Sequence, residues 1–286
     1  MARSGVLCHR DDDGGACSAS LASMIADPET GAAPPTLIAR IGAGARTIAA
    51  RAADIALPPQ CLACDRALAA HGALCPVCWG KLRLIERPYC ARLGIPFSYD
   101  LGEGALSAEA IADPPPFDRC RAVVVFDDVA RKLVHGLKYR DRLELAAWMA
   151  EWMARAGAEV IADADVILPV PLHPRRLWWR RANQSALLAA HVAARVGRPM
   201  APLALRRIRP TDQQVGLTAD QRDRNVRGAF KVPAAEAMAV AGRRVLLVDD
   251  VHTTGATVRA ATRALVRAGA VAVDILVFAR VVRAPV

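Results

Sequence analysis

The stretch VLLVDDVHTTGAT, residues 245–257, constrains the fold more than any other part of the chain. Its apolar run predicts a buried strand, and the alanine-rich segment after it predicts a helix over residues 256–268 that stops at Gly269. Asp249 and Asp250 therefore stand at the carboxyl end of a strand, where open α/β sheets bind their ligands. Successive side chains of a strand point to opposite faces, so the two carboxylates cannot both face one core.

Predicted strands and helices alternate through the second half of the chain. The segments, in chain order, are 122–126 (strand), 128–157 (helix), 165–172 (strand), 183–196 (helix, with Asn183 as N-cap), 244–250 (strand), 256–268 (helix) and 271–282 (strand). This alternation predicts an α/β fold with a mostly parallel sheet and helices on both faces. The sequence shows no internal repeat.

Two Cys-x-x-Cys pairs stand close together in a short segment with few core residues. Each pair can present two sulfurs to one ion, and four thiolates suit the tetrahedral coordination of a structural Zn²⁺. Two disulfides or a redox dithiol are alternatives, although a cytosolic chain disfavours the first and one pair would suffice for the second. The predicted zinc ligands are Cys61, Cys64, Cys75 and Cys78. Cys90 begins no second site, because Leu93 stands where its partner cysteine would be needed.

Composition divides the rest of the chain into segments. Residues 1–35 are rich in Gly, Ala, Asp and Pro without periodicity, which predicts a disordered leader. Residues 36–58 place apolar residues at helical spacing and predict a short amphipathic helix, which is ended by two prolines. We assign residues 59–93 to a zinc ribbon, with a remnant of a second ribbon up to about residue 120, and residues 121–286 to the α/β domain.

The net charge is +10, from 38 basic and 28 acidic residues. Such an excess favours phosphate-bearing partners, either nucleic acid or phosphorylated small molecules, although an Arg-rich compositional bias would give the same value. No apolar run approaches the roughly 18 residues of a membrane span, and the first residues lack the apolar core of a signal peptide. The sequence therefore predicts a soluble cytoplasmic protein with no membrane span.

The residues around the aspartate pair suit two different groups of one ligand. Carboxylates repel phosphate, but they accept hydrogen bonds from a sugar diol or bind Mg²⁺ through water. The turn after them can aim N–H groups and hydroxyls at an anion, and the helix N-terminus adds a favourable dipole. An apolar run ending in Asp-Asp is also typical of the Walker B strand, but the chain has no GxxxxGK[ST] loop. A sugar 5-phosphate with free 2- and 3-hydroxyls satisfies both halves of the site.

These thirteen residues resemble the phosphoribosyl-pyrophosphate (PRPP) signature of type I phosphoribosyltransferases. Together with the cysteine ribbon, the stretches LVHGLKYRDR, LPVPLHPRRLWWRRANQSALLA and QQVGLTADQRDRNVRGAF resemble the ComF family, which is associated with DNA uptake in natural transformation. The resemblance implies a type I phosphoribosyltransferase fold after a small zinc-ribbon module, and PRPP bound with Mg²⁺. It assigns the ribose hydroxyls to Asp249 and Asp250, and the 5-phosphate to Thr253, Thr254, Gly255, Ala256 and Thr257. Relatives commonly carry a second pair of cysteine knuckles that this chain lacks, so one zinc is predicted.

The same resemblance indicates two further segments for PRPP contacts. In this fold class the loop after the strand at 165–172 receives the pyrophosphate, and its candidates are Val170, Pro171, Arg175 and Arg176. The polar segment 206–228 corresponds to a mobile loop that covers PRPP and excludes water, and its candidates are Gln213, Gln214, Arg222 and Asn225. A solvated basic face is the alternative for the arginines. Lys138 and Tyr139 either reach the pocket or lie on a solvated helix face.

Two functions remain open at this point. One is the Mg²⁺-dependent transfer of a 5-phosphoribosyl group from PRPP to an unidentified acceptor, with release of pyrophosphate. The other is a non-catalytic adaptor that binds PRPP or single-stranded DNA and docks a DNA-uptake helicase or a recombination protein. Residues 175–181, RRLWWRR, interleave Trp178 and Trp179 with arginines, a pattern suited to stacking unpaired bases. Packing of one tryptophan in the core is the alternative.

Overall fold

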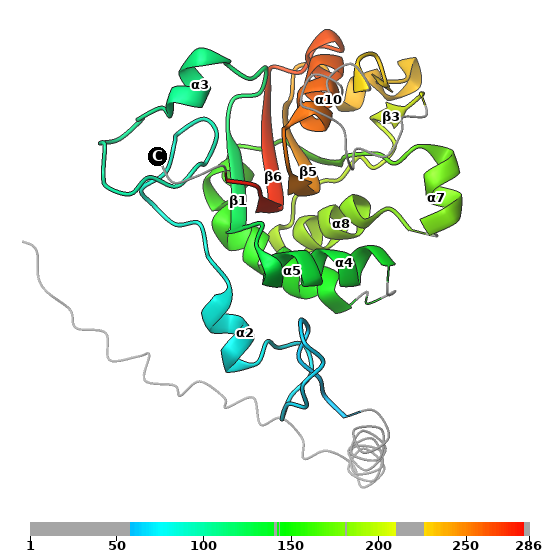
Figure 1. Ribbon diagram of the computed structural model, residues 1–286. Coiled ribbons are helices and arrows are strands. Elements are labelled where there is room, and N and C mark those ends of the chain that lie inside the picture. The colour runs from blue at the N-terminus through cyan, green and yellow to red at the C-terminus, as the bar shows by residue number, and fades with distance from the viewer. Residues whose placement is uncertain (1–57, 140–141, 143, 181, 210–225, 283–286) are drawn as a thin grey trace, which may run out of the picture. The chain divides into compact units, whose positions relative to one another are not determined.

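The computed structural model describes residues 58–139, 142, 144–180, 182–209 and 226–282 (Figure 1). The predicted leader, the predicted amphipathic helix apart from its last residue, and the lid candidates lie outside these ranges. The lid candidates concerned are Gln213, Gln214, Arg222 and Asn225. Among the described residues, no helix is long and apolar enough to cross a membrane.

A four-stranded sheet forms the centre of the α/β domain (Figure 1). Its strands are β1 (Cys120–Val125), β2 (Val166–Pro169), β5 (Arg244–His252) and β6 (Ala272–Arg280). They are hydrogen-bonded in the order β1-β6-β5-β2, and every neighbouring pair is parallel. All of β6 is buried, as expected for a parallel strand covered on both faces. The predicted parallel sheet is therefore confirmed.

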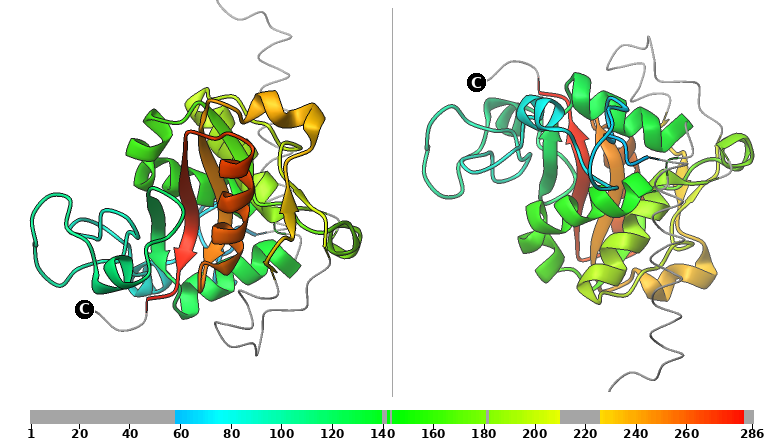
Figure 2. Two further views of the ribbon diagram at one scale, coloured as in Figure 1. Left: turned by 90° about the horizontal axis from the view of Figure 1, so that it is seen from above. Right: turned by 90° about the horizontal axis from the view of Figure 1, so that it is seen from below.

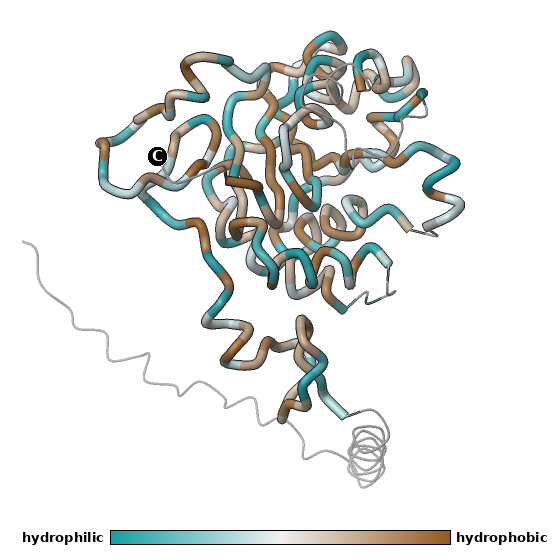
Figure 3. The backbone as a smooth tube through the Cα atoms, in the orientation of Figure 1, coloured by the Kyte–Doolittle hydropathy of each residue, from teal (hydrophilic) through white to brown (hydrophobic). Residues whose placement is uncertain are grey.

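Helices cover both faces of this sheet (Figure 2). They are α4 (Asp128–Tyr139), α5 (Glu144–Ala156), α6 (Ala158–Ala162), α8 (Gln184–Val196) and α10 (Ala256–Arg267). The core that contains α4, α5 and α8 includes Leu246 and Val248, whereas the core that contains α10 includes Val245 and Leu247. Alternate residues of β5 thus enter opposite cores, which explains why its sequence is continuously apolar. The central strands are mostly hydrophobic along their length (Figure 3).

The predicted single helix over residues 128–157 is wrong, because α4 ends at Tyr139 and α5 begins at Glu144. The sequence contains the reason. After Leu137, helical spacing would put charged residues on the buried face until Leu145. Two helices avoid that burial.

Two other predicted elements differ little from the structure. The helix predicted from residue 183 begins at Gln184, and Asn183 is its N-cap, as predicted, with its side chain accepting a hydrogen bond from the Ser185 N–H. The strand predicted at 165–172 is shorter, since β2 ends at Pro169. Neither Pro169 nor Pro171 has an N–H group to extend the ladder.

Several short elements around the sheet are not predicted from the sequence. The helix α7 (Pro174–Arg180) follows β2, and the 3-10 helix η1 (Ala234–Ala239) precedes β5. The strands β3 (Arg206–Arg207) and β4 (Phe230–Lys231) pair antiparallel to each other. This small ladder brings together the two ends of the predicted lid segment, residues 206–228.

Two ribbons precede the domain within the same compact unit, Ala53–Val286: the first contains Cys61–Cys78 and the second contains Cys90–Ala110. They contain the short helices α2 (Pro76–Lys81) and α3 (Ala108–Ala112). The first ribbon packs on the domain through Trp79, whose ring centroid lies 5.1 Å from that of Trp152 in α5. Arg142 also joins the two, because its Nη1 lies 3.0 Å from Asp65 Oδ1.

Candidate functional site

The aspartate pair lies in β5, which continues to His252, two residues beyond the predicted end of the strand. Asp250 is 7% exposed, and its Oδ2 lies 2.6 Å from Nζ of Lys138 in α4. Asp249 is partly exposed, and its Oδ1 accepts a hydrogen bond from Ser185 Oγ in α8 at 2.8 Å. Each carboxylate therefore has its own partner, brought to it by a different helix. The sequence left Lys138 open and gave no indication of Ser185.

The environment of the pair disfavours a full charge on both carboxyl groups. The pKa of Asp249 is raised from 3.8 to about 7, chiefly by burial of its carboxyl group and secondly by the neighbouring charge of Asp250. The hydrogen bond from Ser185 and the charge of Lys138 oppose this rise without cancelling it. Hydroxyl donors or a cation in the site would favour the charged form of Asp249.

We expect Asp249→Asn to stabilise the protein above about pH 7 and to have little effect near pH 4. The folded pKa lies above the ordinary value, so between about pH 4 and 7 the folded state holds a proton that the unfolded chain has lost. Stability therefore falls as pH rises through that window. Asn does not ionise, so the variant avoids this loss of stability. The loss is on the order of a few kcal/mol, because each unit of pKa difference between the folded and unfolded states corresponds to about 1.4 kcal/mol. Thermal unfolding of both proteins across this pH range measures the difference.

Asp250→Asn is the matched control for this experiment. Because Asp250 is paired with Lys138, losing its charge should destabilise the protein instead of stabilising it. If Asp249→Asn is less stable than the parent protein at every pH, the raised pKa is wrong.

The turn after the aspartates leaves the start of α10 open. Gly255 is the N-cap residue, with φ of +77°, and no side chain caps the first turn. A Cβ at Gly255 would lie 2.8 Å from Nε2 of His252, so both backbone conformation and packing require glycine here. Thr254 Oγ1 is buried without a partner among the described residues. Thr253 is exposed, and Ala256 and Thr257 begin the helix, so the predicted phosphate-binding residues share one turn suited to an anion.

His252 lies beneath this turn and is missed by reasoning from sequence. It is 5% exposed, and its ring lies edge-on to that of Phe117. Neither ring nitrogen has a partner among the described residues. Burial lowers the pKa of His252 to about 3, so the ring is neutral at physiological pH. It therefore supports Gly255 by packing and adds no charge near the turn.

The loop after β2 lies next to the aspartate pair. The Val170 N–H donates to the Val248 carbonyl, one residue before Asp249. Asn183 Nδ2 donates to the Val170 carbonyl at 3.1 Å. Val170 and Pro171 are both buried. These contacts fix the loop against β5 and the start of α8, and they give Asn183 a second role beside its capping bond.

Basic residues approach the aspartates from α7 and β3. Arg175 is exposed and Arg176 is partly exposed on α7. Burial lowers the pKa of Arg207 in β3 to about 10, and the charges of Arg176 and Asp249 also act on it. Arg207 is thus within electrostatic reach of both Arg176 and Asp249. Arg207 is a further cation that the sequence does not single out.

The four predicted zinc ligands come together in the first ribbon. Their sulfur atoms all lie within 4.8 Å of one another, and Cys64 Sγ is 3.7 Å from Cys75 Sγ. A tetrahedral Zn²⁺ with bonds of about 2.3 Å needs sulfurs about 3.8 Å apart. The Cys75 N–H also donates to Cys61 Sγ, which favours the thiolate. The cluster therefore fits a structural zinc ion.

The second ribbon repeats the backbone of the first. The Ser107 N–H donates to Cys90 Sγ at 3.2 Å, as the Cys75 N–H does to Cys61 Sγ at 3.2 Å. Ser107 caps α3 by accepting a hydrogen bond from the Ala110 N–H, as Cys75 caps α2 by accepting one from the Cys78 N–H. Left-handed residues recur at matching places, Asp65 with φ of 59° and Gly94 with φ of 62°.

The sequence-based conclusion that the chain has no internal repeat is therefore wrong. Three of the four ligand positions differ between the two ribbons, so the ligand residues do not reveal the repeat that the backbone shows. The positions that correspond to Cys64, Cys75 and Cys78 hold Leu93, Ser107 and Ala110. All three are buried, so side-chain packing occupies the place that a metal would take.

Comparisons with known proteins agree with this organisation. Family models match a double zinc ribbon domain at residues 52–112 and a phosphoribosyl transferase domain at residues 182–284. DNA utilization protein YhgH of Salmonella typhimurium is 32% identical over 228 residues, which are 77% of this chain and 96% of that protein. Competence protein F of Haemophilus influenzae is 26% identical over 231 residues, with the same coverage. This chain is a member of the ComF family. Its fold is the type I phosphoribosyltransferase fold, preceded by a zinc ribbon module.

ComF membership accounts for both ribbons as well as for the domain. The double-ribbon match includes the second copy, although three of its four ligand positions are not cysteine. The transferase match begins just before α8 and includes the aspartate pair, the turn and α10. Lys138 lies outside that match and reaches the pair from α4.

Proposed function

We propose that this ComF protein binds PRPP with Mg²⁺ at the aspartate pair and transfers the 5-phosphoribosyl group to an acceptor, with release of pyrophosphate. The observation that carries the proposal is the position of Asp249 and Asp250 just before the uncapped start of α10. The carboxylates would accept hydrogen bonds from the ribose hydroxyls, and the turn at Gly255 would bind the 5-phosphate. One ligand with both groups matches the whole arrangement.

The surrounding residues suit a reaction that needs positioning and charge neutralisation more than proton transfer. Lys138 pairs with Asp250 and holds its side chain in place. Arg176 and Arg207, together with the Val170–Pro171 loop, would receive the pyrophosphate. Mg²⁺ bound with PRPP would neutralise the leaving group. The candidates Gln213, Gln214, Arg222 and Asn225 remain proposals for a loop that closes over the site.

Calorimetric titration with PRPP and Mg²⁺ tests the binding step directly. We expect saturable binding of PRPP that requires Mg²⁺. Inorganic sulfate should weaken this binding, because it competes with the 5-phosphate for the turn. Pyrophosphate release in the presence of candidate acceptors then tests turnover. A protein that binds no PRPP would contradict the proposal, whereas binding without release for any acceptor would favour the adaptor below.

The second candidate function is a non-catalytic adaptor in DNA uptake, and α7 favours it. Trp178 and Trp179 are 80% and 82% exposed, so the alternative that one of them packs in the core is wrong. Their ring centroids lie 6.4 Å apart, the ring planes meet at 78°, and Arg175 and Arg176 belong to the same helix. Exposed rings beside cations suit single-stranded DNA. The names of the relatives, DNA utilization protein and Competence protein F, agree with such a role, which would place the protein in the cytoplasm beside a helicase or recombination protein.

We expect two pairs of substitutions to separate stacking from charge in this surface. Arg175→Ala/Arg176→Ala should lower the slope of log affinity against log salt by about 1.4, at roughly 0.7 per lost phosphate contact. Trp178→Ala/Trp179→Ala should leave the slope unchanged and lower the affinity by about 1–3 kcal/mol per unstacked base. Fluorescence anisotropy with labelled oligonucleotides measures both. Unchanged affinity and slope in both variants would show that α7 is only a solvated surface. Arg180 and Arg181 are the other two arginines of the RRLWWRR stretch.

A further inference from the structure

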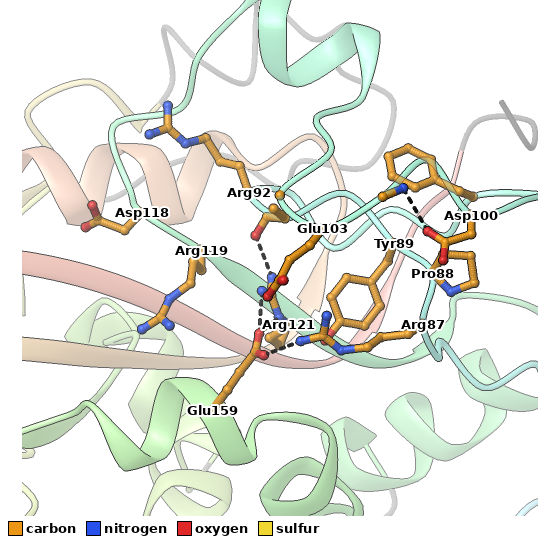
Figure 4. Close-up of a pocket in the computed structure, with 14 residues that line it drawn as sticks. Arg87, Pro88, Tyr89, Arg92, Asp100, Glu103, Asp118, Arg119, Arg121 and Glu159 are labelled. Carbon is orange, nitrogen blue, oxygen red and sulfur yellow. Dashed lines mark hydrogen bonds and ion pairs between the residues drawn. The ribbon is translucent and has the colours of Figure 1, made fainter.

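We propose that a pocket between the second ribbon and the start of β1 binds a small phosphate ester of nucleotide size (Figure 4). Its volume of about 600 Å³ lies within the usual range of small-molecule sites. Its walls come from residues 87–104 of the ribbon, from residues 118–121 before and in β1, and from Glu159 of α6. Among the described residues, those of the aspartate pair and its turn do not line this pocket, so it is a separate site.

The pocket wall contains residues of the second ribbon that differ in charge and aromatic character from the matching residues of the first ribbon. Cys90 corresponds to Cys61, so residues of the second ribbon match those 29 positions earlier. At the positions that line the pocket, Arg87, Tyr89 and Arg92 replace Pro58, Gln60 and Ala63. The copy without the metal ligands therefore carries two cations and an aromatic ring that the zinc copy lacks.

The loop of the second ribbon is also longer than that of the first. Thirteen residues lie between Leu93 and Ser107, whereas ten lie between the corresponding Cys64 and Cys75. The additional length forms part of the pocket wall, which includes Gly102 and Gly104. Both glycines have positive φ, 89° and 78°, and a Cβ on either would meet no atom within 4 Å. The turn thus needs glycine for its conformation and exposes its backbone to the pocket.

One side of the pocket is a rigid group of charged and aromatic side chains. Arg87 Nη2 lies 2.7 Å from Glu159 Oε2, and the Arg121 guanidinium bonds to the other oxygen of the same carboxylate. The two guanidinium carbons lie 5.2 Å and 4.7 Å from the centroid of the Tyr89 ring. Two cations therefore share one carboxylate (Figure 4), which leaves a local excess of positive charge.

Two other residues of the pocket wall have side chains whose binding capacity is not used within the described residues. Neither Arg92 nor Glu103 forms an ion pair or a side-chain hydrogen bond there. The remaining carboxylates of the wall are engaged, because Asp100 accepts from the Gly102 N–H and Asp118 from the Val273 N–H. The pocket thus presents one unengaged cation and one unengaged carboxylate.

A nucleoside monophosphate matches these groups better than a smaller ligand does. Arg92 can bind the phosphate, and Glu103 can accept hydrogen bonds from ribose hydroxyls. Tyr89 and Phe97 give the flat base an aromatic wall. A single amino acid could use Arg92 and Glu103, but it would fill only a small part of the volume.

The test is a calorimetric titration of the full chain with AMP. We expect saturation below about 1 mM, and weaker binding of inorganic phosphate and of adenosine, each of which has only part of the ligand. The measurement is repeated in Asp249→Asn/Asp250→Asn, where AMP binding should persist although the proposed PRPP site is disabled. Arg92→Ala should weaken AMP about tenfold or more. Arg66→Ala, at an exposed position of the first ribbon, is the matched control and should bind AMP like the parent protein.

The outcomes separate this site from the proposed PRPP site. AMP binding that disappears in the double Asn variant would assign the nucleotide to the aspartate pair and overturn the proposal. Equal affinity of Arg92→Ala and the parent protein, or AMP no tighter than inorganic phosphate, would overturn it as well. Circular dichroism and zinc content show that each variant is folded. A protein that binds AMP but not PRPP would contradict the proposed function and still support the proposed nucleotide site, because the two sites share no residue.

Discussion

The variant Cys75→Ser/Cys78→Ser should contain no zinc and should lose the structure of the first ribbon. Only two thiolates would remain, too few for the tetrahedral site that the sulfur positions fit. Metal binding supplies about 10–16 kcal/mol in zinc-finger peptides, far more than the few buried side chains of this ribbon can replace. Cys75 also caps α2, so one substitution changes both the metal site and the helix start.

Metal analysis measures this prediction, with an expected value of one zinc per parent chain and none in the variant. Tryptophan fluorescence should change in parallel, because Trp79 would leave Trp152. Cys90→Ser is the matched control and should keep one zinc, since the second ribbon has Leu93, Ser107 and Ala110 at its other ligand positions. Two equivalents of zinc in the parent protein, or one that survives in the variant, would contradict the single-site prediction.

The parts of the fold that follow local rules could be predicted from the sequence. The parallel sheet follows from continuous apolar runs alternating with helical periodicity, and Asn183 is a local N-cap signal. The zinc cluster follows from the spacing of Cys61, Cys64, Cys75 and Cys78. The aspartate pair and its turn lie within thirteen consecutive residues, so their arrangement needs no long-range information.

The residues that complete the site could not be predicted because their contacts are long-range. Lys138 and Asp250 come from segments more than a hundred residues apart, and nothing in either segment specifies the other. Ser185 and Asp249 are 64 residues apart, and again neither segment specifies the other. His252 has a local signal, since it stands two residues after Asp250 in the same strand and therefore on the same side.

The second ribbon shows a different limit of reasoning from sequence. Residue identity at Cys90, Leu93, Ser107 and Ala110 no longer resembles a metal site. The hydrogen bonds to Cys90 Sγ and Ser107 Oγ nevertheless keep the shape of one. The same backbone geometry can therefore form with and without the metal ligands.

We expect Asp249→Asn/Asp250→Asn to weaken PRPP by about a hundredfold or more while leaving inorganic phosphate and sulfate little changed. Each charge-assisted hydrogen bond lost costs on the order of 1.5–3 kcal/mol, and two such acceptors would be lost for the ribose hydroxyls. Phosphate alone has no diol, so it loses nothing at the carboxylates. A small gain in phosphate affinity is expected, because Lys138 is released from Asp250 and a repelling charge is removed. Calorimetry with each ligand measures the contrast.

Gly255→Val provides the opposite contrast on the same turn. Its φ of +77° strains a β-branched residue, and the added Cβ would lie 2.8 Å from His252, so the start of α10 must move. Every phosphate ligand should then weaken together, with or without a ribose. A merely structural role of the aspartates predicts neither contrast. If the double Asn variant keeps the parent affinity for PRPP and an intact circular dichroism spectrum, the carboxylates do not bind the ribose, and the proposed function is wrong.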